Sequence, residues 1–262
     1  MAQVPAAMSA LRILRYLGTR RGPVSAASIA TALSLPRSSV YHLLAALIET
    51  GFVVHLETEH LYGVGPAAAE IGTAYSRQVP IARIATPALD ALVERIGESA
   101  HLSVLLGQNV VYVSEVRAPR RPMLVSETGV RLPAHLTASG RAILAALPAK
   151  QIRALYPDAA AFPHSSADKT SWSPGRLRTT LQKVRARGWA VERGEITAGM
   201  SSVAVAIHDH LGWPCAALAF TVEDERLPAE REPVLINALR AVANKLENTL
   251  CAENSPRAHP SA

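Results

Sequence analysis

A chain of 262 residues is long enough for one large domain or two modest ones, and its 49% hydrophobic residues suffice for a buried core. No apolar run reaches the roughly 18–20 residues that a membrane-spanning helix needs, so no membrane partner is expected. The formal net charge of +6 is compatible with a polyanionic partner, although charge alone does not establish one.

The two cysteines give no sign of a disulfide framework or a metal site, since Cys215 and Cys251 stand alone and far apart. The apolar stretch over residues 1–21 is interrupted by arginines and does not resemble a secretory signal. We therefore expect a protein of the reducing cytoplasm that carries no metal and no other cofactor.

The first two predicted helices are short and closely spaced. Residues 8–17 carry Leu11, Leu14 and Leu17 at helical spacing, and Gly22-Pro23 ends that helix. Ser25 can cap the N-terminus of a second helix, "AASIATALS", because its hydroxyl can accept from an orphan backbone amide.

A third helix and a hairpin follow. Pro36 suits the first position of a helix, and Gly51 suits the position after its end. The stripe that faces the core is formed by Val40, Leu43, Leu44, Leu47 and Ile48. Apolar residues on both sides of "ETEH" predict two short strands over 52–65. The order helix, helix, turn, helix, hairpin is that of a winged helix-turn-helix, which we place at 5–65.

The polar start of this third helix carries side chains that no core requires. A recognition helix needs such an end to enter the major groove, about 12 Å wide, and to touch bases and phosphates. The candidate DNA contacts are Ser25, Ser28, Arg37, Ser38, Ser39, Tyr41 and His42. A solvated helix start is the alternative interpretation, since Ser and Arg are common there, but the surrounding elements favour DNA binding.

The rest of the chain alternates helices with strands and predicts one α/β domain over 84–252. A connecting helix is expected over 66–83, interrupted near Pro80, and a polar, disordered tail over 253–262. Between them the expected elements are a helix at 85–99, a hairpin at 100–116, a loop and helix at 129–148, a helix ended by glycine within 173–195, two strands at 200–222 and a last helix.

Three other patterns are weaker. His208-Asp209-His210 has the residue types of a metal site but no third ligand nearby, so a polar β-turn is expected. "TASG" at 137–140 lacks the glycine pattern of a serine nucleophile and is explained by a helix start, so no catalytic residue is predicted. Basic residues Arg117, Arg120 and Arg121 are interpreted as solvated.

The two halves together resemble the IclR family of bacterial transcriptional regulators over about residues 6–250. The stretch "LPRSSVYHLLAALIETGFV" is similar to the family's third helix and wing entry. Further along, "GVRLPAHLTASGRAILAALP" resembles the family's Gly…Pro-x-His-x-x-Ala-x-Gly-(Lys)-Ala-x-Leu-Ala run. "VRARGWAVERGEITAGMSSVAVAI" resembles its Arg-x-x-Gly-(aromatic)…Glu-x-x-x-Gly…Ala-x-x-(Val/Ile) run.

The resemblance implies a GAF-like effector domain that binds a small organic metabolite, often a carboxylate, in a pocket lined by 129–140 and by the strands at 200–221. It also implies homodimers or dimers of dimers that read a palindromic operator in double-stranded DNA. The effector-binding residues implied in this sequence are His135, Gly140, Glu192, Ser202, Ala219 and Thr221.

The sequence departs from the family pattern at several of these places. His42 replaces an arginine, Ser34 a turn glycine, Arg141 a lysine and Ser202 a cysteine. Ala219 replaces a serine, and a hydrogen bond to charge left unmade costs roughly 1.5–3 kcal/mol. We therefore expect an effector that is bulkier or less polar than the smallest two-carbon acids.

The predicted fold class is α+β, with an N-terminal winged helix-turn-helix and a C-terminal GAF-like effector-binding α/β domain. The expected function is that of a DNA-binding transcriptional regulator, not an enzyme, whose operator binding is modulated by a small organic acid. The alternative is a metabolite-binding or enzymatic domain whose helical N-terminal domain serves only for dimerisation.

Overall fold

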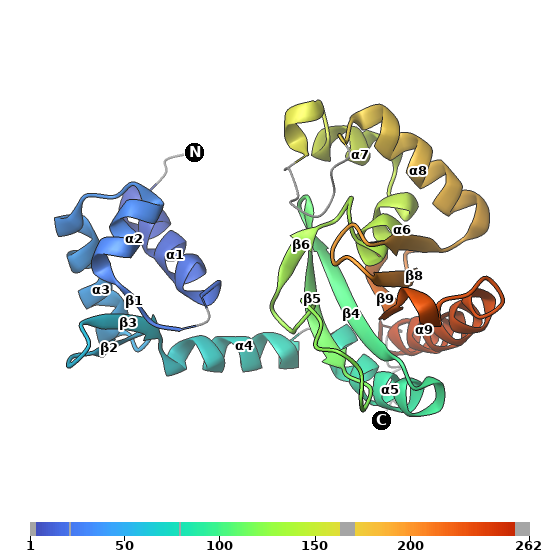
Figure 1. The fold of residues 1–262 in the computed structure, drawn as a ribbon, viewed down its shortest axis with the longest axis horizontal. Helices are drawn as coiled ribbons and strands as arrows, with labels where there is room; N and C mark the ends of the chain where they lie inside the picture. Colours follow the sequence, from blue (N-terminus) through green and yellow to red (C-terminus); the bar gives the residue numbers. More distant parts are fainter. Residues whose placement is uncertain (1–3, 21, 79, 163–170, 255–262) are drawn as a thin grey trace, which may run out of the picture. The chain divides into compact units, whose positions relative to one another are not determined.

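The computed structural model describes residues 4–20, 22–78, 80–162 and 171–254. The chain divides into two compact units, Met1–Gln78 and Val79–Ala262. Each unit has its own β-sheet, as the ribbon in Figure 1 shows. Each unit also has its own hydrophobic core.

The first unit is a winged helix-turn-helix, as the sequence predicts. Its helices are α1 (Pro5–Gly18), α2 (Ala26–Leu33) and α3 (Arg37–Glu49). Its antiparallel sheet has the order β1-β3-β2, with β1 at Val24–Ser25, β2 at Val53–Leu56 and β3 at Leu61–Val64. The two-residue strand β1 was not predicted, because a strand this short is defined by its partner β3 and not by any pattern of its own.

The buried stripe of α1 differs from the predicted one by one residue. Ile13 and Leu17 are buried and pack against Ile29 of α2 and Leu44 of α3. Leu11, which the leucine spacing placed on that stripe, is 56% exposed. The helix therefore presents an apolar side chain on its outer face.

The turn between α2 and α3 is held by local hydrogen bonds. The Ser25 hydroxyl caps α2 by accepting from the Ser28 amide at 3.2 Å, as predicted. Ser34 ends α2 in the left-handed conformation, with φ 53°, a conformation that glycine adopts without steric cost and serine does not. Pro36 is the N-cap of α3, immediately before the first helical residue, Arg37, whereas the sequence predicts Pro36 itself at the first helical position.

Two helices follow the wing. Helix α4 (Pro66–Gln78) ends before Pro80, where the sequence predicts the interruption, and α5 (Pro80–Ile96) begins there. Ile81 and Ala82 are already buried in the core of the second unit, so the last residues of the range 66–83 belong to α5 and not to a connector. Helix α5 ends at Ile96, three residues before the predicted end at 99, and Gly97 follows it with φ 72°.

The second unit is built on a six-stranded antiparallel sheet in the order β6-β5-β4-β9-β8-β7. The strands are β4 (Ser99–Leu106), β5 (Asn109–Val116), β6 (Arg131–Pro133), β7 (Ala190–Arg193), β8 (Met200–His208) and β9 (Pro214–Glu223). Helices α5 and α9 (Glu232–Asn254) pack on one face. Helices α6 (Ala138–Ala146) and α8 (Pro174–Arg187) pack on the other. This confirms the predicted α+β fold class.

Several short elements of this unit were not predicted. They are β6, β7, α7 (Ala149–Leu155) and two 3-10 turns at Ala159–Ala161 and Asp224–Arg226. The last helix runs to Asn254, so residues 253 and 254 are helical where a tail was expected; residues 255–262 lie outside the described residues. Within the described part of the chain, no helix combines the length and the apolar character that crossing a membrane requires.

Candidate functional site

The first candidate site is the outer face of α3. Arg37, Ser38, Tyr41 and His42 are exposed. Arg37 and Tyr41 are four residues apart, as are Ser38 and His42, so the two pairs lie side by side on one side of the helix. Val40, Leu44 and Leu47 are buried on the opposite side. Ser39 is half-buried between the two sides.

Two other predicted DNA contacts lie at the start of α2. The Ser25 and Ser28 hydroxyls are 3.0 Å apart, and Ser25 also accepts from the Ser28 amide. Ser25 is therefore engaged as a helix cap, while Ser28 remains exposed. Arg12 of α1 donates to the Leu33 carbonyl at 3.0 Å and ties α1 to the end of α2.

The second candidate site is a cavity of about 430 Å³, open mouth included, in the second unit. It lies on the face of the sheet that α6 and α8 cover. Its lining comes from the start of α6, the strands and two loops: Tyr112, Leu124, Val125, Ser126, Leu132, Thr137, Ala138, Ser139, Glu192, Ile196, Thr197, Met200, Ser202, Ala219 and Thr221. Among these, Glu192 is the one carboxylate, and no Lys, Arg or His side chain is present in this lining.

Four of the six expected effector residues line this cavity: Glu192, Ser202, Ala219 and Thr221. The other two, His135 and Gly140, do not. A Cβ on Gly140 would stand 2.2 Å from the Ala134 carbonyl oxygen, so glycine allows α6 to start close to the preceding backbone. These two residues therefore shape the cavity from behind its wall.

His135 stands in an aromatic cluster and not in the cavity lining. Its ring contacts those of Tyr156, Phe162 and Trp172, with centroids 6.0, 5.1 and 5.2 Å away. All three contacts are edge-to-face, the geometry that aromatic rings prefer. His135 thereby fixes the backbone that leads into α6.

Glu192 is buried and has an unusual proton affinity. Its Oε1 accepts from the amides of Glu195 at 2.7 Å and Ile196 at 3.1 Å. Burial raises the pKa of the Glu192 carboxyl to about 7, with the nearby Glu195 also raising it, while the backbone amides and the Ser202 hydroxyl oppose the shift. Near neutral pH this carboxyl is therefore part protonated.

The Ser202 hydroxyl forms a hydrogen bond with the Glu192 carboxyl and lies 3.0 Å from the Thr221 hydroxyl. At the start of α6, the Thr137 hydroxyl accepts from the Gly140 amide at 3.0 Å. Ala138 and Ser139, the first two residues of this helix, line the cavity. The first amides of a helix favour an anion. Hydroxyls, amides and one titratable acid are thus the polar groups that a ligand would meet.

Arg141 fixes the turn that carries the acid. Its guanidinium donates to the carbonyls of His135 at 2.7 Å and Val191 at 2.9 Å and to the Glu195 carboxylate at 2.7 Å. The resemblance suggested only that Arg141 replaces a lysine. A planar guanidinium can donate in three directions at once, as it does here, whereas a lysine ammonium has no such fixed fork.

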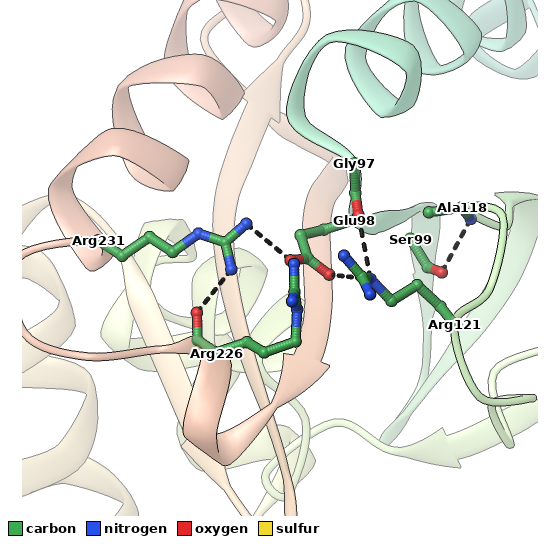
Figure 2. Close-up of polar contacts among 7 residues, drawn as sticks. All are labelled: Gly97, Glu98, Ser99, Ala118, Arg121, Arg226 and Arg231. Atoms are coloured by element: carbon green, nitrogen blue, oxygen red, sulfur yellow. Dashed lines mark hydrogen bonds and ion pairs between the residues drawn. The ribbon is translucent and has the colours of Figure 1, made fainter.

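The loop between β5 and β6 forms another wall, through Leu124, Val125 and Ser126. Figure 2 shows how its start is anchored: Arg121 donates from Nε to the Glu98 Oε2 at 2.9 Å and to the Gly97 carbonyl at 3.1 Å. The Ala118 amide donates to the Ser99 hydroxyl at 3.1 Å. The interpretation of Arg121 as merely solvated was wrong, while Arg117 and Arg120 are exposed.

Glu98 is fully buried and forms ion pairs with two further arginines. Arg226 donates to its Oε1 at 2.6 Å and Arg231 lies 2.7 Å from the same oxygen. Arg231 also donates to the Arg226 carbonyl at 2.8 Å. One carboxylate thus joins the loop over the cavity to the segment between β9 and α9.

The remaining sequence motifs have structural explanations. His208 Nδ1 pairs with Glu247 Oε1 at 2.9 Å, and the Asp209 carboxylate accepts from the amides of Leu211 and Trp213. This confirms the predicted polar β-turn. Within the part of the chain that the structure describes, no group of three His, Cys, Asp or Glu is placed to hold a metal ion.

Comparison with known proteins gives consistent results for the two units. Residues 6–57 match the IclR helix-turn-helix domain, and residues 73–248 match the family described as bacterial transcriptional regulator IclR, C-terminal. The chain is similar to the glycerol operon regulatory protein of Streptomyces coelicolor, with 32% identity over 93% of this chain and 95% of that protein.

Solved structures have the same fold. A transcriptional regulator from Rhodococcus sp. RHA1 is 28% identical, with a TM-score of 0.79 over 96% of this chain and 100% of the other. An IclR homologue from Microbacterium hydrocarbonoxydans, complexed with 4-hydroxybenzoate, is 21% identical, with a TM-score of 0.79 over 94% of this chain and 99% of the other. The winged helix-turn-helix, the sheet with its cavity and the family matches over both units agree: the chain belongs to the IclR family of bacterial transcriptional regulators.

Proposed function

We propose that α3 is the recognition helix and that Arg37, Ser38, Ser39, Tyr41 and His42 contact DNA from its polar side. The observation that carries this proposal is the exposure of four of these side chains on one side of a helix whose other side is buried. A helix held in this way can enter the major groove with its N-terminal end first. Ser25 and Ser28 would contact the phosphate backbone from the start of α2.

We propose that the cavity of the second unit binds a small organic acid. The α6 amides at Ala138 and Ser139, with the Ser202 and Thr221 hydroxyls, would receive the carboxylate. The apolar walls at Leu124, Leu132 and Met200 favour a ligand with a hydrophobic body, in agreement with an alanine at 219. The homologue solved with 4-hydroxybenzoate gives an example of such a ligand in this fold.

Ligand binding would change the affinity for DNA, and this coupling is reciprocal: an acid that weakens DNA binding must itself bind less well to the DNA-bound protein. The chain would act as a regulator in the bacterial cytoplasm and would catalyse no reaction, as the names of its relatives as regulators support.

A second copy of the chain would pack against the outer face of α1. Val4, Met8 and Leu11 are spaced as one helical stripe and are 63%, 50% and 56% exposed. Two recognition helices related by a twofold axis would then read a palindromic operator. Leu11→Asp should shift sedimentation from dimer to monomer, whereas Leu211→Asp, at another exposed leucine, should leave it unchanged; the reverse pattern would refute this interface.

DNA binding is tested by protection footprinting on the DNA that flanks the gene, followed by fluorescence anisotropy on the protected duplex. Affinity should fall steeply with salt, because phosphate contacts release counterions. Arg37→Ala should weaken binding by roughly 1–3 kcal/mol if Arg37 reads a base. Arg153→Ala, which removes the same charge from an exposed position on α7, is the matched control; equal effects of the two variants would contradict the proposed docking.

A further inference from the structure

Two polar side chains of β4 are buried without a hydrogen-bond partner. His101 and Ser103 have no exposed surface. Neither ring nitrogen of His101, nor the Ser103 hydroxyl, has a partner within the residues that the structure describes. Buried polar groups are nearly always paired, so an unpaired imidazole in a core requires an explanation.

Both side chains lie on the cavity side of the sheet. His101 stands directly opposite Ala219 and Ser103 directly opposite Ala217, and opposed residues of antiparallel strands share a face. Ala219 lines the cavity. The His101 ring also meets the ring of Tyr112, another lining residue, edge to face with centroids 5.6 Å apart. The imidazole is thus flanked by two residues of the cavity wall.

Small side chains lie beside His101 on the cavity side of the sheet. On the next strand, Ala204 stands opposite Ala219, so methyl groups cover the sheet on that side of the imidazole. The serine that the family resemblance places at 219 would add a hydroxyl there. Alanine at this position removes that polar group and places a single methyl group beside the histidine.

His101 is neutral at physiological pH, because burial lowers the pKa of its imidazole to about 4. A neutral imidazole has one N–H donor and one acceptor nitrogen. It therefore suits an uncharged polar group, such as a hydroxyl, better than a carboxylate, which could use only the donor.

We propose that His101 recognises a ring hydroxyl of a cyclic hydroxy acid whose carboxylate binds at the start of α6 beside Ser202 and Thr221. This inference rests on the proposed function of the cavity as the effector site. From Thr221 to Ala219 the strand rises by about 7 Å, which suits a ring with a substituent at each end. His101 thereby determines specificity from just behind the lining residues Ala219 and Tyr112, and Ser103 extends the polar surface there.

The test compares benzoate with 4-hydroxybenzoate, which differ by one hydroxyl, by isothermal titration calorimetry on the full chain. The wild type should bind 4-hydroxybenzoate at least tenfold more tightly. His101→Phe, which keeps a ring but removes both nitrogens, should abolish this preference and leave benzoate affinity unchanged. His101→Gln should restore part of the preference for 4-hydroxybenzoate. Ala219→Val should reduce this preference, because the larger side chain would block access to His101.

Each outcome decides the inference. Equal affinity of the wild type for the two acids, which a buried water on His101 would produce, overturns it, as does an unchanged preference in His101→Phe. If that variant does not fold, the ¹⁵N resonances of the His101 imidazole in the wild type replace it, and they must move with 4-hydroxybenzoate and not with benzoate. Failure of both acids to bind overturns the inference. The proposed function is contradicted by a different result, namely that no acid of a wider panel alters DNA binding.

Discussion

Glu192 is the residue of the cavity whose charge changes near neutral pH, because the pKa of its carboxyl is about 7. A carboxylate ligand beside it would meet a second negative charge whenever Glu192 is ionised. Like charges in close contact favour the protonated form of one of them. Binding of an acid should therefore be accompanied by uptake of a proton at Glu192.

This coupling predicts the pH dependence of binding. As pH rises above about 7, affinity for benzoate or 4-hydroxybenzoate should fall, by up to about tenfold per pH unit when one proton is taken up. Glu192→Gln keeps an oxygen for the amides of Glu195 and Ile196 but cannot ionise, so its affinity should vary little between pH 6 and 8. Calorimetry in buffers of different ionisation enthalpy measures the proton directly, and an identical pH profile for the variant would contradict the coupling.

The same residue affects folding stability. Its folded-state pKa of about 7 lies above the ordinary 4.5, so the folded chain binds more protons between these values. The contribution of Glu192 to the free energy of unfolding is therefore present below this window and is lost as pH rises through it. In Glu192→Gln, the free energy of unfolding should not show this decrease as pH rises.

At the scale of elements, the loop from β5 to β6 depends on one buried carboxylate. Glu98 accepts from Arg121 of the loop and from Arg226 and Arg231, which are about one-third exposed or less. Removing one member of a buried charge network leaves the others unpaired in the interior. The loop that carries Leu124 and Ser126 should then lose its position over the cavity.

Glu98→Gln should lower the free energy of unfolding by about 3 kcal/mol, at the lower end for buried pairs because the arginines retain some contact with water. Chemical denaturation monitored by circular dichroism measures this change. Glu225→Gln, at an exposed acid of the neighbouring turn, is the control and should change stability by less than about 0.5 kcal/mol. Equal effects would show that the network does not hold the loop.

Elements with a strong local pattern were the ones that the sequence could predict. The stripe of α3 and the glycine stop at Gly188 after α8 needed no information from distant residues. Ile48 is the exception: the sequence placed it on the core-facing stripe, and it is 38% exposed. Strands β6 and β7 could not be predicted, because three or four residues carry too little pattern and their pairing is decided by β5 and β8. The same holds for β1.

The cavity was predicted only in its polar half. Glu192, Ser202 and Thr221 followed from the family resemblance, and the structure places them together. Ile196 and Met200 could not be distinguished from core residues, since an apolar wall and an apolar core show one and the same pattern. The roles of Arg121 and His101 could not be predicted either. Whether each side chain finds a hydrogen-bond partner depends on contacts with residues far away in the sequence.

For the whole molecule, the chain passes from the DNA-binding unit to the effector unit through α4. If a ligand in the second unit alters DNA binding by the first, this helix lies on the covalent path between the two units and can transmit the change. A proline inside a helix removes one hydrogen bond and clashes with the preceding turn, at a cost of about 3 kcal/mol. Glu70, exposed and in the middle of α4, offers a position away from both sites.

Glu70→Pro should leave ligand affinity within about twofold of the wild type, because the second unit has its own core, yet reduce the effect of ligand on DNA binding. Glu70→Ala removes the same charge without breaking the helix and should behave as the wild type. Parallel calorimetry and anisotropy separate the two readouts. Loss of ligand affinity in the proline variant would place α4 within the effector unit.

The Ser202–Thr221 pair has a consequence for what the cavity can host. Each hydroxyl has a single proton, so the row Glu192, Ser202, Thr221 can be ordered in two directions. With Glu192 ionised, Thr221 donates to Ser202 and Ser202 donates to the carboxylate. The Thr221 oxygen then has a free lone pair, which can accept a hydrogen bond from an alcohol. With Glu192 protonated, the directions reverse: Glu192 donates to Ser202 and Ser202 donates to Thr221. The Thr221 O–H is then free to donate to an anion. A single proton thus reverses the polarity of the cavity wall without moving any heavy atom.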